Sequence, residues 1–255
     1  METLAEFFET GVYVFMLIFM RIGTAMMLFP GIGDTYTPVR VRLFLGLGLT
    51  LVLFPLLSQI MPSEIPGTFA FFILLFREFM LGAFIGIVAR ILLMALDTAG
   101  MLVSLQAGLS NAQLFNPALA TQGSIIGAFF VITGTMLIFV TDLHHLMIYG
   151  LVNSYEIFPV GAVLPFDTMG ELVTKAVATA FYTGVSVAAP FLVVTLLLYI
   201  GMGVLARLMP QVQVFLLAIP VQILLSFTVM AVGVVAGLTY WLSFYEQGIR
   251  FFFGG

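Results

Sequence analysis

Residues 176–206 read AVATAFYTGVSVAAPFLVVTLLLYIGMGVLA, a stretch without a single charged side chain. A helix rises about 1.5 Å per residue and the hydrocarbon core of a bilayer is about 30 Å thick, so about 20 apolar residues can cross it. This stretch is long enough to do so. Pro190 lies in its middle, lacks a backbone N–H and clashes with the preceding turn. We therefore expect a transmembrane helix that is kinked or broken at Pro190.

Five other stretches have a similar character. They are residues 11–30, interrupted only by Arg21; residues 43–61; residues 68–96, which exceed one span; the uncharged residues 98–141, whose first half is not lipid-like; and residues 208–245, apolar from Val214 onwards. Backbone in lipid must satisfy its own hydrogen bonds, so each is predicted to be helical. The expected fold class is all-α, a polytopic membrane protein of about six long hydrophobic helices. Residues 142–171 are expected to form an acidic loop.

Glycines at a spacing of four recur along these stretches. Gly-x-x-x-Gly occurs at Gly82/Gly86, Gly123/Gly127 and Gly233/Gly237. Such pairs let two helix backbones approach closely, although the spacing is also common by chance. Each pair is therefore a candidate for close helix packing. The sequence shows no repeat of fixed period and no low-complexity tail, so residues 1–255 are expected to form a single domain.

Composition excludes several classes of function. Of the 255 residues 62% are hydrophobic and 8% are charged, whereas a soluble domain has roughly 45–50% and about 25%. The formal net charge is −4 and Lys175 is the single lysine, so no basic patch is available for nucleic acid. The absence of cysteine excludes thiol catalysis and thiolate metal sites. Gly-x-Ser-x-Gly, phosphate-loop and dinucleotide motifs are absent from the sequence too, and we expect neither an enzyme nor a cofactor.

Four charged side chains lie inside the predicted helices: Arg21, Arg77, Glu78 and Arg90. Each costs about 2.5–3.5 kcal/mol at the centre of a bilayer, so together they would offset the stability of a whole domain unless they are paired or hydrated. Residues three and four positions from Arg77 and Glu78 are apolar, so partners must come from another helix or another subunit. We predict buried charge pairing, with a contact between Arg21 and Glu78. Structural pairing across a helix interface is favoured over an ion or proton pathway.

The segment Asp142-Leu143-His144-His145 has side chains that could bind a metal or transfer a proton. Adjacent histidines on a helix diverge by about 100° and rarely share one metal. No Glu-x-x-His or His-x-x-x-His spacing supports them. The segment is therefore interpreted as a polar helix end at a surface or interface, and neither a catalytic nor a metal-binding residue is predicted.

The stretch most unlike the rest comprises residues 100–122, which carry five side-chain amides and no charge. Gly108 and Asn116-Pro117 argue against one continuous helix there. Irregular backbone in a membrane protein is tolerated only where it is buried in protein or lines a cavity. We therefore predict a pore-lining or plugging loop rather than an ordinary surface loop. The candidate residues are Gln106, Gly108, Asn111, Gln113, Leu114, Phe115, Asn116 and Pro117.

Several short motifs, taken in chain order, resemble one family. They are Arg21, Pro30, Pro38 and Arg40; Glu78-x-x-x-Gly82-x-x-x-Gly86; Ala99-Gly100; residues 106–110, QAGLS; Asn116-Pro117; Asp142-Leu143-His144; Ser154; Pro159-Val160-Gly161; Arg207-x-x-Pro210-Gln211; Phe215; and Pro220. Each is weak alone, but their common order over nearly the whole chain resembles the FliR/SctT family. These are export-gate subunits of bacterial flagellar and virulence type III secretion systems. Ala107 and Asn116 depart from the methionine and aspartate that are frequent in the family.

The resemblance implies a non-enzymatic export-gate subunit. Family members assemble with FliP-like and FliQ-like subunits into a closed gate of helical hairpins, contacted by FlhB-like and FlhA-like proteins and by membrane lipid. Unfolded export substrates pass through this gate, which belongs to the flagellar basal body in the bacterial inner (cell) membrane and lies largely above the membrane plane. Residues 106–117 would match the loop that plugs the channel, with Leu114 and Phe115 as apolar stoppers. The family motif positions include Asp142, His144, Arg207, Pro210 and Gln211.

Two alternatives stay open at the level of sequence. One is a subunit of the homologous virulence type III secretion system. The other is a small-molecule or ion secondary transporter, which would also place charges and a broken helix in the membrane. Transporters of that kind have discontinuous helices at matching positions of two halves. The sequence shows no second counterpart to Pro190, so the export gate is favoured.

Overall fold

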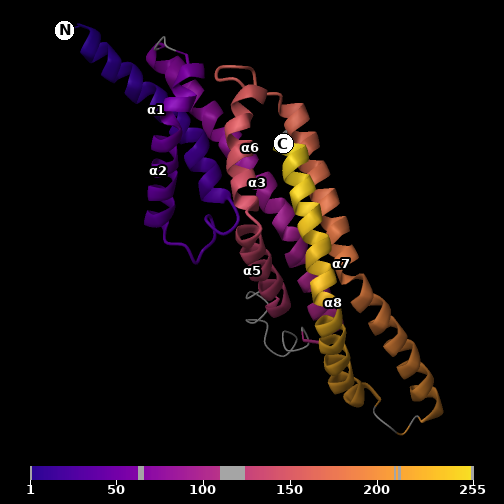
Figure 1. Ribbon diagram of the computed structural model, residues 1–255. Helices are drawn as coiled ribbons and strands as arrows, with labels where there is room; N and C mark the ends of the chain where they lie inside the picture. Colours follow the sequence, from indigo (N-terminus) through magenta and orange to yellow (C-terminus); the bar gives the residue numbers. More distant parts are fainter. Residues whose placement is uncertain (1, 63–65, 110–123, 210, 212–213, 254–255) are drawn as a thin grey trace. The chain divides into compact units, whose positions relative to one another are not determined.

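The structure is a computed structural model, and it describes residues 2–62, 66–109, 124–209, 211 and 214–253. Within these residues it is all-helical and contains no strand (Figure 1). The helices are α1 (Glu2–Leu28), α2 (Val39–Leu57), the short 3₁₀ helix η1 (Ser58–Ile60), α3 (Thr68–Gln106), α5 (Ile125–Val140), α6 (Leu143–Ile157), α7 (Phe166–Leu208) and α8 (Val214–Phe253). The predicted all-α fold class is confirmed.

Five of these helices are long and apolar enough to cross a membrane, namely α1, α2, α3, α7 and α8. The pair α5 and α6, interrupted by a bend at Thr141 and Asp142, passes the same test together and raises the number of spans in the described residues to six. The prediction of about six long hydrophobic helices, some of them kinked or broken, is therefore confirmed.

The expected acidic loop over residues 142–171 is wrong. Helix α6 fills residues 143–157 and α7 begins at Phe166, so only residues 158–165 of this stretch connect helices. The buried residues Met147, Leu151 and Ser154 recur at helical spacing and form one face of α6. Helix α6 is only about four turns long and charged residues lie at its ends. For this reason its charges led to the prediction of a loop.

Of the kink or break expected at Pro190, the break is wrong. Helix α7 runs through Pro190 without interruption from Phe166 to Leu208, and Pro55 and Pro220 likewise lie inside α2 and α8. A proline deletes one backbone hydrogen bond, and neighbouring helices and side chains can compensate for that loss in an apolar bundle. The chain is interrupted instead before α6, where Asp142 has a left-handed backbone (φ 59°).

Contacts divide the chain into two compact units, which are described separately. The first unit comprises Met1–Ile91, Asp142–Ala176 and Gly248–Gly255. Its helices α1 and α2 form an antiparallel hairpin in which the rings of Phe15 and Phe54 lie 6.1 Å apart. At its other end a side chain at Gly46 would meet the Cα atom of Gly23 at 3.3 Å. The two helices therefore pack through glycines near their connection and through aromatic rings further from it.

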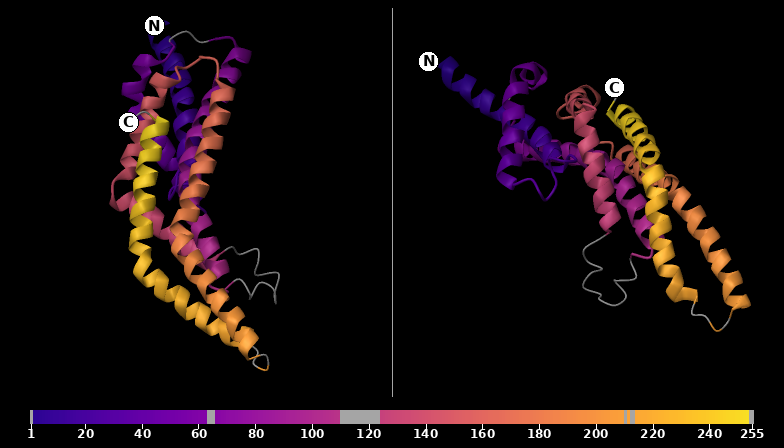
Figure 2. Two further views of the ribbon diagram at one scale, coloured as in Figure 1. Left: turned by 90° about the vertical axis from the view of Figure 1, so that its right-hand side faces the viewer. Right: turned by 60° about the horizontal axis from the view of Figure 1, so that its bottom comes forward.

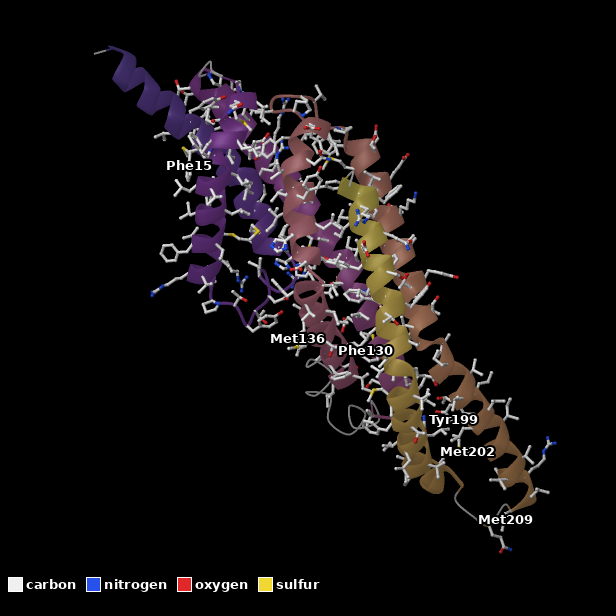
Figure 3. The ribbon with its side chains drawn as sticks, in the orientation of Figure 1. Phe15, Phe130, Met136, Tyr199, Met202 and Met209 are labelled. Atoms are coloured by element: carbon white, nitrogen blue, oxygen red, sulfur yellow. The ribbon has the colours of Figure 1, made fainter. Side chains whose placement is uncertain are left out.

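The second unit comprises Leu92–Thr141 and Val177–Gln247. Within it α7 and α8 run antiparallel, as both views of Figure 2 show: Val187 lies beside Gly237, and Tyr199 beside Gln222. The chain's single tryptophan, Trp241 on α8, is fully buried and donates a hydrogen bond of 3.1 Å to a backbone carbonyl of α3. On α5, Phe130 is buried in the core of this unit while Met136 is exposed (Figure 3).

Close glycine packing occurs at some of the predicted pairs. A Cβ atom at Gly82 would overlap the carbonyl of Arg21, so only glycine lets α3 lie this close to α1. A Cβ atom at Gly86 would lie 2.5 Å from the Cβ atom of Leu28 and 3.1 Å from the carbonyl oxygen of Ala25, so α3 lies close to α1 at both glycines. In contrast, a Cβ atom at Gly233 would meet nothing within 4 Å. The predicted close packing is therefore confirmed for Gly82/Gly86, whereas no described residue of this chain packs closely against Gly233, and Gly123 lies outside the described residues.

Candidate functional site

The first unit contains a buried ion pair between α1 and α3. Arg21 is fully buried and Glu78 is 1% exposed. The guanidinium approaches the carboxylate side-on, with Nε 2.6 Å from Oε2 and Nη2 3.0 Å from Oε1. Such a two-point contact is the strongest geometry available to arginine and carboxylate. The structure thus brings together the two side chains that the sequence analysis paired.

The remaining donors of Arg21 are taken up by α6 and the residue after it. Nη1 donates to the carbonyl and the hydroxyl of Ser154 at 3.1 and 3.2 Å, and Nη2 donates to the carbonyl of Phe158 at 2.9 Å. The guanidinium carbon also lies 3.9 Å from the ring centre of Tyr155, a cation–π contact. All five guanidinium N–H groups therefore have an acceptor. A group that is fully satisfied inside its own chain is suited to holding three helices together.

The other two predicted charges have separate partners. Arg90 forms an ion pair of 2.9 Å with Asp34, whose second carboxylate oxygen accepts hydrogen bonds from the amide of Gly31 and the hydroxyl of Tyr36. Arg77 is only partly buried and donates to the carbonyl of Gly161 at 3.0 Å. The predicted pairing with an acid is therefore present for Arg90, whereas the described contact of Arg77 is with a neutral carbonyl.

The Asp142 segment lies at the start of α6. Its carboxylate and the two imidazoles place ligand atoms within 4.8 Å of one another, and the rings of His144 and His145 lie 4.0 Å apart. The expected divergence of the rings is therefore wrong, because side-chain rotation brings them together. Asp142 and His145 are mostly exposed, and Asp142 Oδ1 lies 3.4 Å from His145 Nδ1. The three side chains thus stand together at the N-terminal end of α6, with ligand atoms close enough to hold one metal ion.

The second unit holds the point at which the amide-rich stretch leaves α3. Gln106 is the last helical residue, and Gly108 follows with a left-handed backbone (φ 72°). The amides of Gly108 and Leu109 donate to the carbonyls of Leu105 and Ser104, each at 3.2 Å. This is the Schellman arrangement, which needs glycine because L side chains avoid that backbone. The predicted interruption at Gly108 is confirmed, whereas α3 extends past Leu96, where the sequence analysis ended this run.

The carbonyl of Gln106, which the helix itself leaves unused, accepts a hydrogen bond from Nε2 of Gln222 on α8. The same nitrogen lies 3.1 Å from the hydroxyl of Tyr199 on α7, a residue labelled in Figure 3. Gln222 is 5% exposed. The sequence analysis did not single out Gln222. A lone amide inside the apolar run 214–245 was nevertheless a signal, because a buried amide needs a hydrogen-bond partner.

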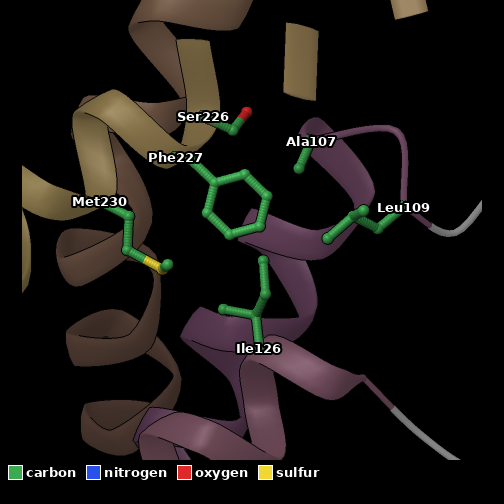
Figure 4. A pocket seen from close by; sticks show the side chains of 6 residues that line it. All are labelled: Ala107, Leu109, Ile126, Ser226, Phe227 and Met230. Atoms are coloured by element: carbon green, nitrogen blue, oxygen red, sulfur yellow. The ribbon is translucent and has the colours of Figure 1, made fainter. Parts of the chain in front are cut away.

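Beside this contact lies a small apolar depression with no room for a water molecule (Figure 4). It is lined by Ala107, Leu109, Ile126, Ser226, Phe227 and Met230, from the end of α3, the start of α5 and α8. Leu109 and Ile126, which precede and follow residues 110–123 in the sequence, thus both lie beside α8. The candidate plug residues Asn111, Gln113, Leu114, Phe115, Asn116 and Pro117 themselves lie outside the described residues, as does Pro210.

Three further polar residues lie on α3, on α7 and in the turn after α7. Arg207 is exposed in the last turn of α7, and Gln211 is exposed in the turn that follows. Asp97, half-buried on α3, was treated in the sequence only as the border between two apolar runs. Its side chain reaches the first turn of α5, where a Cβ atom at Gly127 would come within 2.7 Å of Oδ1.

The fold and these contacts define a multi-span membrane protein whose buried polar groups join helices to one another. Residues 12–248 match the model of the family described as bacterial export proteins, family 1, and the chain belongs to that family. It is 35% identical to the flagellar biosynthetic protein FliR of Caulobacter vibrioides over 94% of this chain and 96% of that protein. To the FliR of Aquifex aeolicus it is 29% identical, over 84% and 83%.

A relative from virulence secretion is similar as well. The Yop proteins translocation protein T of Yersinia pestis is 31% identical over 60% of each chain. The predicted membership of the FliR family is confirmed. The protein is a non-enzymatic membrane component of the flagellar export apparatus, homologous to a type III secretion protein.

Proposed function

We propose that the chain is one subunit of a hetero-oligomeric gate for unfolded proteins in the bacterial inner membrane. FliP-like and FliQ-like subunits would complete the gate, with FlhB-like and FlhA-like proteins in contact with it. The family match over residues 12–248 supports a single gate domain over residues 1–255. Its coverage of the flagellar relatives is wider than that of the virulence protein, which favours flagellar substrates.

The observation that carries the proposal is the length of the exposed apolar helices. On α7, exposed side chains extend from Val177 to Leu205, about 42 Å along the helix, and on α3 from Phe69 to Leu105, about 54 Å. Even at the steep tilt of about 40°, a helix crosses a core of about 30 Å within roughly 39 Å. Lipid alone therefore does not cover these surfaces, and unlike protein subunits are the natural cover for the remainder.

Residues 106–117 are proposed as the plug of this gate. The stretch is uncharged and mixes amides with Leu114 and Phe115, so apolar contacts can seal while amides compete only weakly for a passing backbone. Its root is well held, because Gly108 ends α3 and Gln222 binds the last helical carbonyl. A fixed root is what a short plug requires to return to one position.

Purification tests the assembly. The tagged chain, expressed with the other membrane components of the export apparatus and extracted in mild detergent, should elute as a stable complex with unlike subunits. A monomer or a symmetric homodimer under these conditions would contradict the proposal.

The plug has its own test. Deleting residues 111–117 should make cells, and vesicles holding the purified complex, leak ions or small solutes. The deletion variant must still assemble for its leakage to be compared with that of the wild type. An elution profile like that of the wild type shows this. An unchanged permeability barrier in an assembled complex would remove the plug from the proposal.

A further inference from the structure

The second unit is almost free of charge. Among residues 92–141 and 177–247 only Asp97, Arg207 and Glu246 carry one. Asp97 is the one inside the apolar part of α3, half-buried between Leu96 and Thr98. Within the part of the chain that the structure describes, no ion pair or hydrogen bond reaches its carboxylate. A carboxylate inside a membrane helix is costly, and a partner for it is expected.

The groups that touch Asp97 inside the chain are neutral. The first turn of α5 lies against the carboxylate, at Gly127. The hydroxyl of Ser124 beside it is already engaged, because it donates to the carbonyl of Gly100 and accepts from the amide of Gly127. The start of a helix offsets part of the cost of a nearby anion, but it supplies no counter-charge. The described residues of the unit therefore leave the negative charge of Asp97 without a counter-charge.

The surface around Asp97 is apolar and exposed. Met94, Met101 and Leu105 lie three residues before and four and eight residues after it, on the same side of α3, and each is at least half exposed. We call Met94, Asp97, Met101 and Leu105 the Asp97 face. The three apolar side chains of this face could lie against lipid, but the carboxylate could not. With the carboxylate, it fits an apolar helix that carries a cation.

We propose that the Asp97 face binds an apolar helix of an unlike subunit, and that a lysine or arginine on this helix pairs with Asp97. The inference rests on the proposed assembly into a hetero-oligomeric gate. Charge complementarity selects this occupant over a second copy of the chain, because a symmetric contact would bring two carboxylates together. Thioether side chains at Met94 and Met101 adapt to a partner surface.

Three substitutions separate charge from shape. Asp97→Asn keeps the size and removes the charge, Asp97→Lys reverses it, and Asp97→Glu retains it. Breaking one side of a buried charge pair lowers affinity on the order of a hundred-fold or more. The yield of complex from mild detergent should therefore fall strongly for Asp97→Asn and further for Asp97→Lys, while Asp97→Glu keeps most of it. Asp167→Asn, an exposed acid in the first turn of α7, is the matched control.

A genetic screen followed by crosslinking can locate the partner helix. Motility suppressors of Asp97→Lys should replace a lysine or arginine in an apolar helix of another subunit by an acidic residue. Because the chain contains no cysteine, Asp97→Cys should then crosslink to a cysteine placed at the suppressor position. Suppressors confined to this chain would overturn the proposal.

Three further outcomes distinguish failure of the proposed function from failure of the Asp97 face. If the wild-type chain forms no complex with unlike subunits, the proposed function fails. If the wild type assembles and Asp97→Asn assembles equally well, the function stands and the Asp97 face is overturned. The Asp97 face is also overturned if Asp97→Asn lowers the unfolding midpoint of the isolated chain in detergent, because the carboxylate then acts within the chain. The proposal expects this midpoint to be unchanged.

Discussion

The two units treat polar groups in opposite ways. In the first, charge is buried and fully bonded: Arg21 uses every donor on Glu78, Ser154 and Phe158. In the second, charge is nearly absent, and a single amide, Gln222, holds the end of α3. A saturated ion pair fixes one arrangement of three helices, whereas the hydrogen bond of Gln222 fixes only the end of α3. The first unit thus resembles a scaffold, and the second is suited to carrying the stretch proposed as the plug.

The largest expected effect is the loss of the ion pair. Arg21→Ala or Glu78→Ala leaves one buried charge without its partner, which destabilises a protein by about 3–5 kcal/mol. Unfolding of the purified chain in detergent measures it, with the exposed Arg40→Ala as control. Arg21→Lys should be nearly as harmful because an ammonium cannot reproduce the planar fork.

Exchanging the charges sharpens the same point. With Arg21→Glu and Glu78→Arg together, the new carboxylate would face the carbonyls of Ser154 and Phe158, which now accept from Arg21. The exchange is therefore expected to fail even though the pair is nominally restored. Recovery of wild-type stability would show that the carbonyl contacts contribute little, and that the first unit is held by Coulomb attraction alone.

An effect of intermediate size is expected at Gly82. Gly82→Ala forces a Cβ atom onto the carbonyl of Arg21, and overpacking of this kind costs about 1–3 kcal/mol. Gly233→Ala is the control in the second unit: it meets open space and replaces glycine in a helix interior, so it should stabilise by up to about 1 kcal/mol. Opposite signs in the same unfolding assay are expected. Equal effects would contradict the difference in packing between these two glycines.

Much of this architecture could be predicted from sequence, for physical reasons. Apolar length alone identifies the spans, and the cost of charge in lipid predicts that Arg21 and Glu78 meet. Helix α6 was not predicted because its apolar pattern covers few residues and its ends are polar. Asp97 was mistaken for a boundary because a charge interrupts a hydropathy run without interrupting a helix. The partner of Gln222 depends on the long-range contact of α8 with α3, to which local sequence gives no access.

The smallest expected effect on stability concerns the hydrogen bond between Gln222 and the carbonyl of Gln106. Gln222→Met keeps the volume but removes the donor to the Gln106 carbonyl, and a neutral hydrogen bond contributes about 1 kcal/mol. The chain should therefore fold and assemble, while vesicles holding the complex leak more than wild type because the root of the plug is less well held. Thr228→Val is the matched control, since its exposed hydroxyl bonds only within α8. Tyr199→Phe, which removes the second contact of Gln222, should leak less than Gln222→Met. Vesicles with the deletion of residues 111–117 could leak while vesicles with Gln222→Met do not. In that case the plug is held by the apolar contacts of Leu109 and Ile126, and the amide of Gln222 only satisfies the carbonyl at the end of α3.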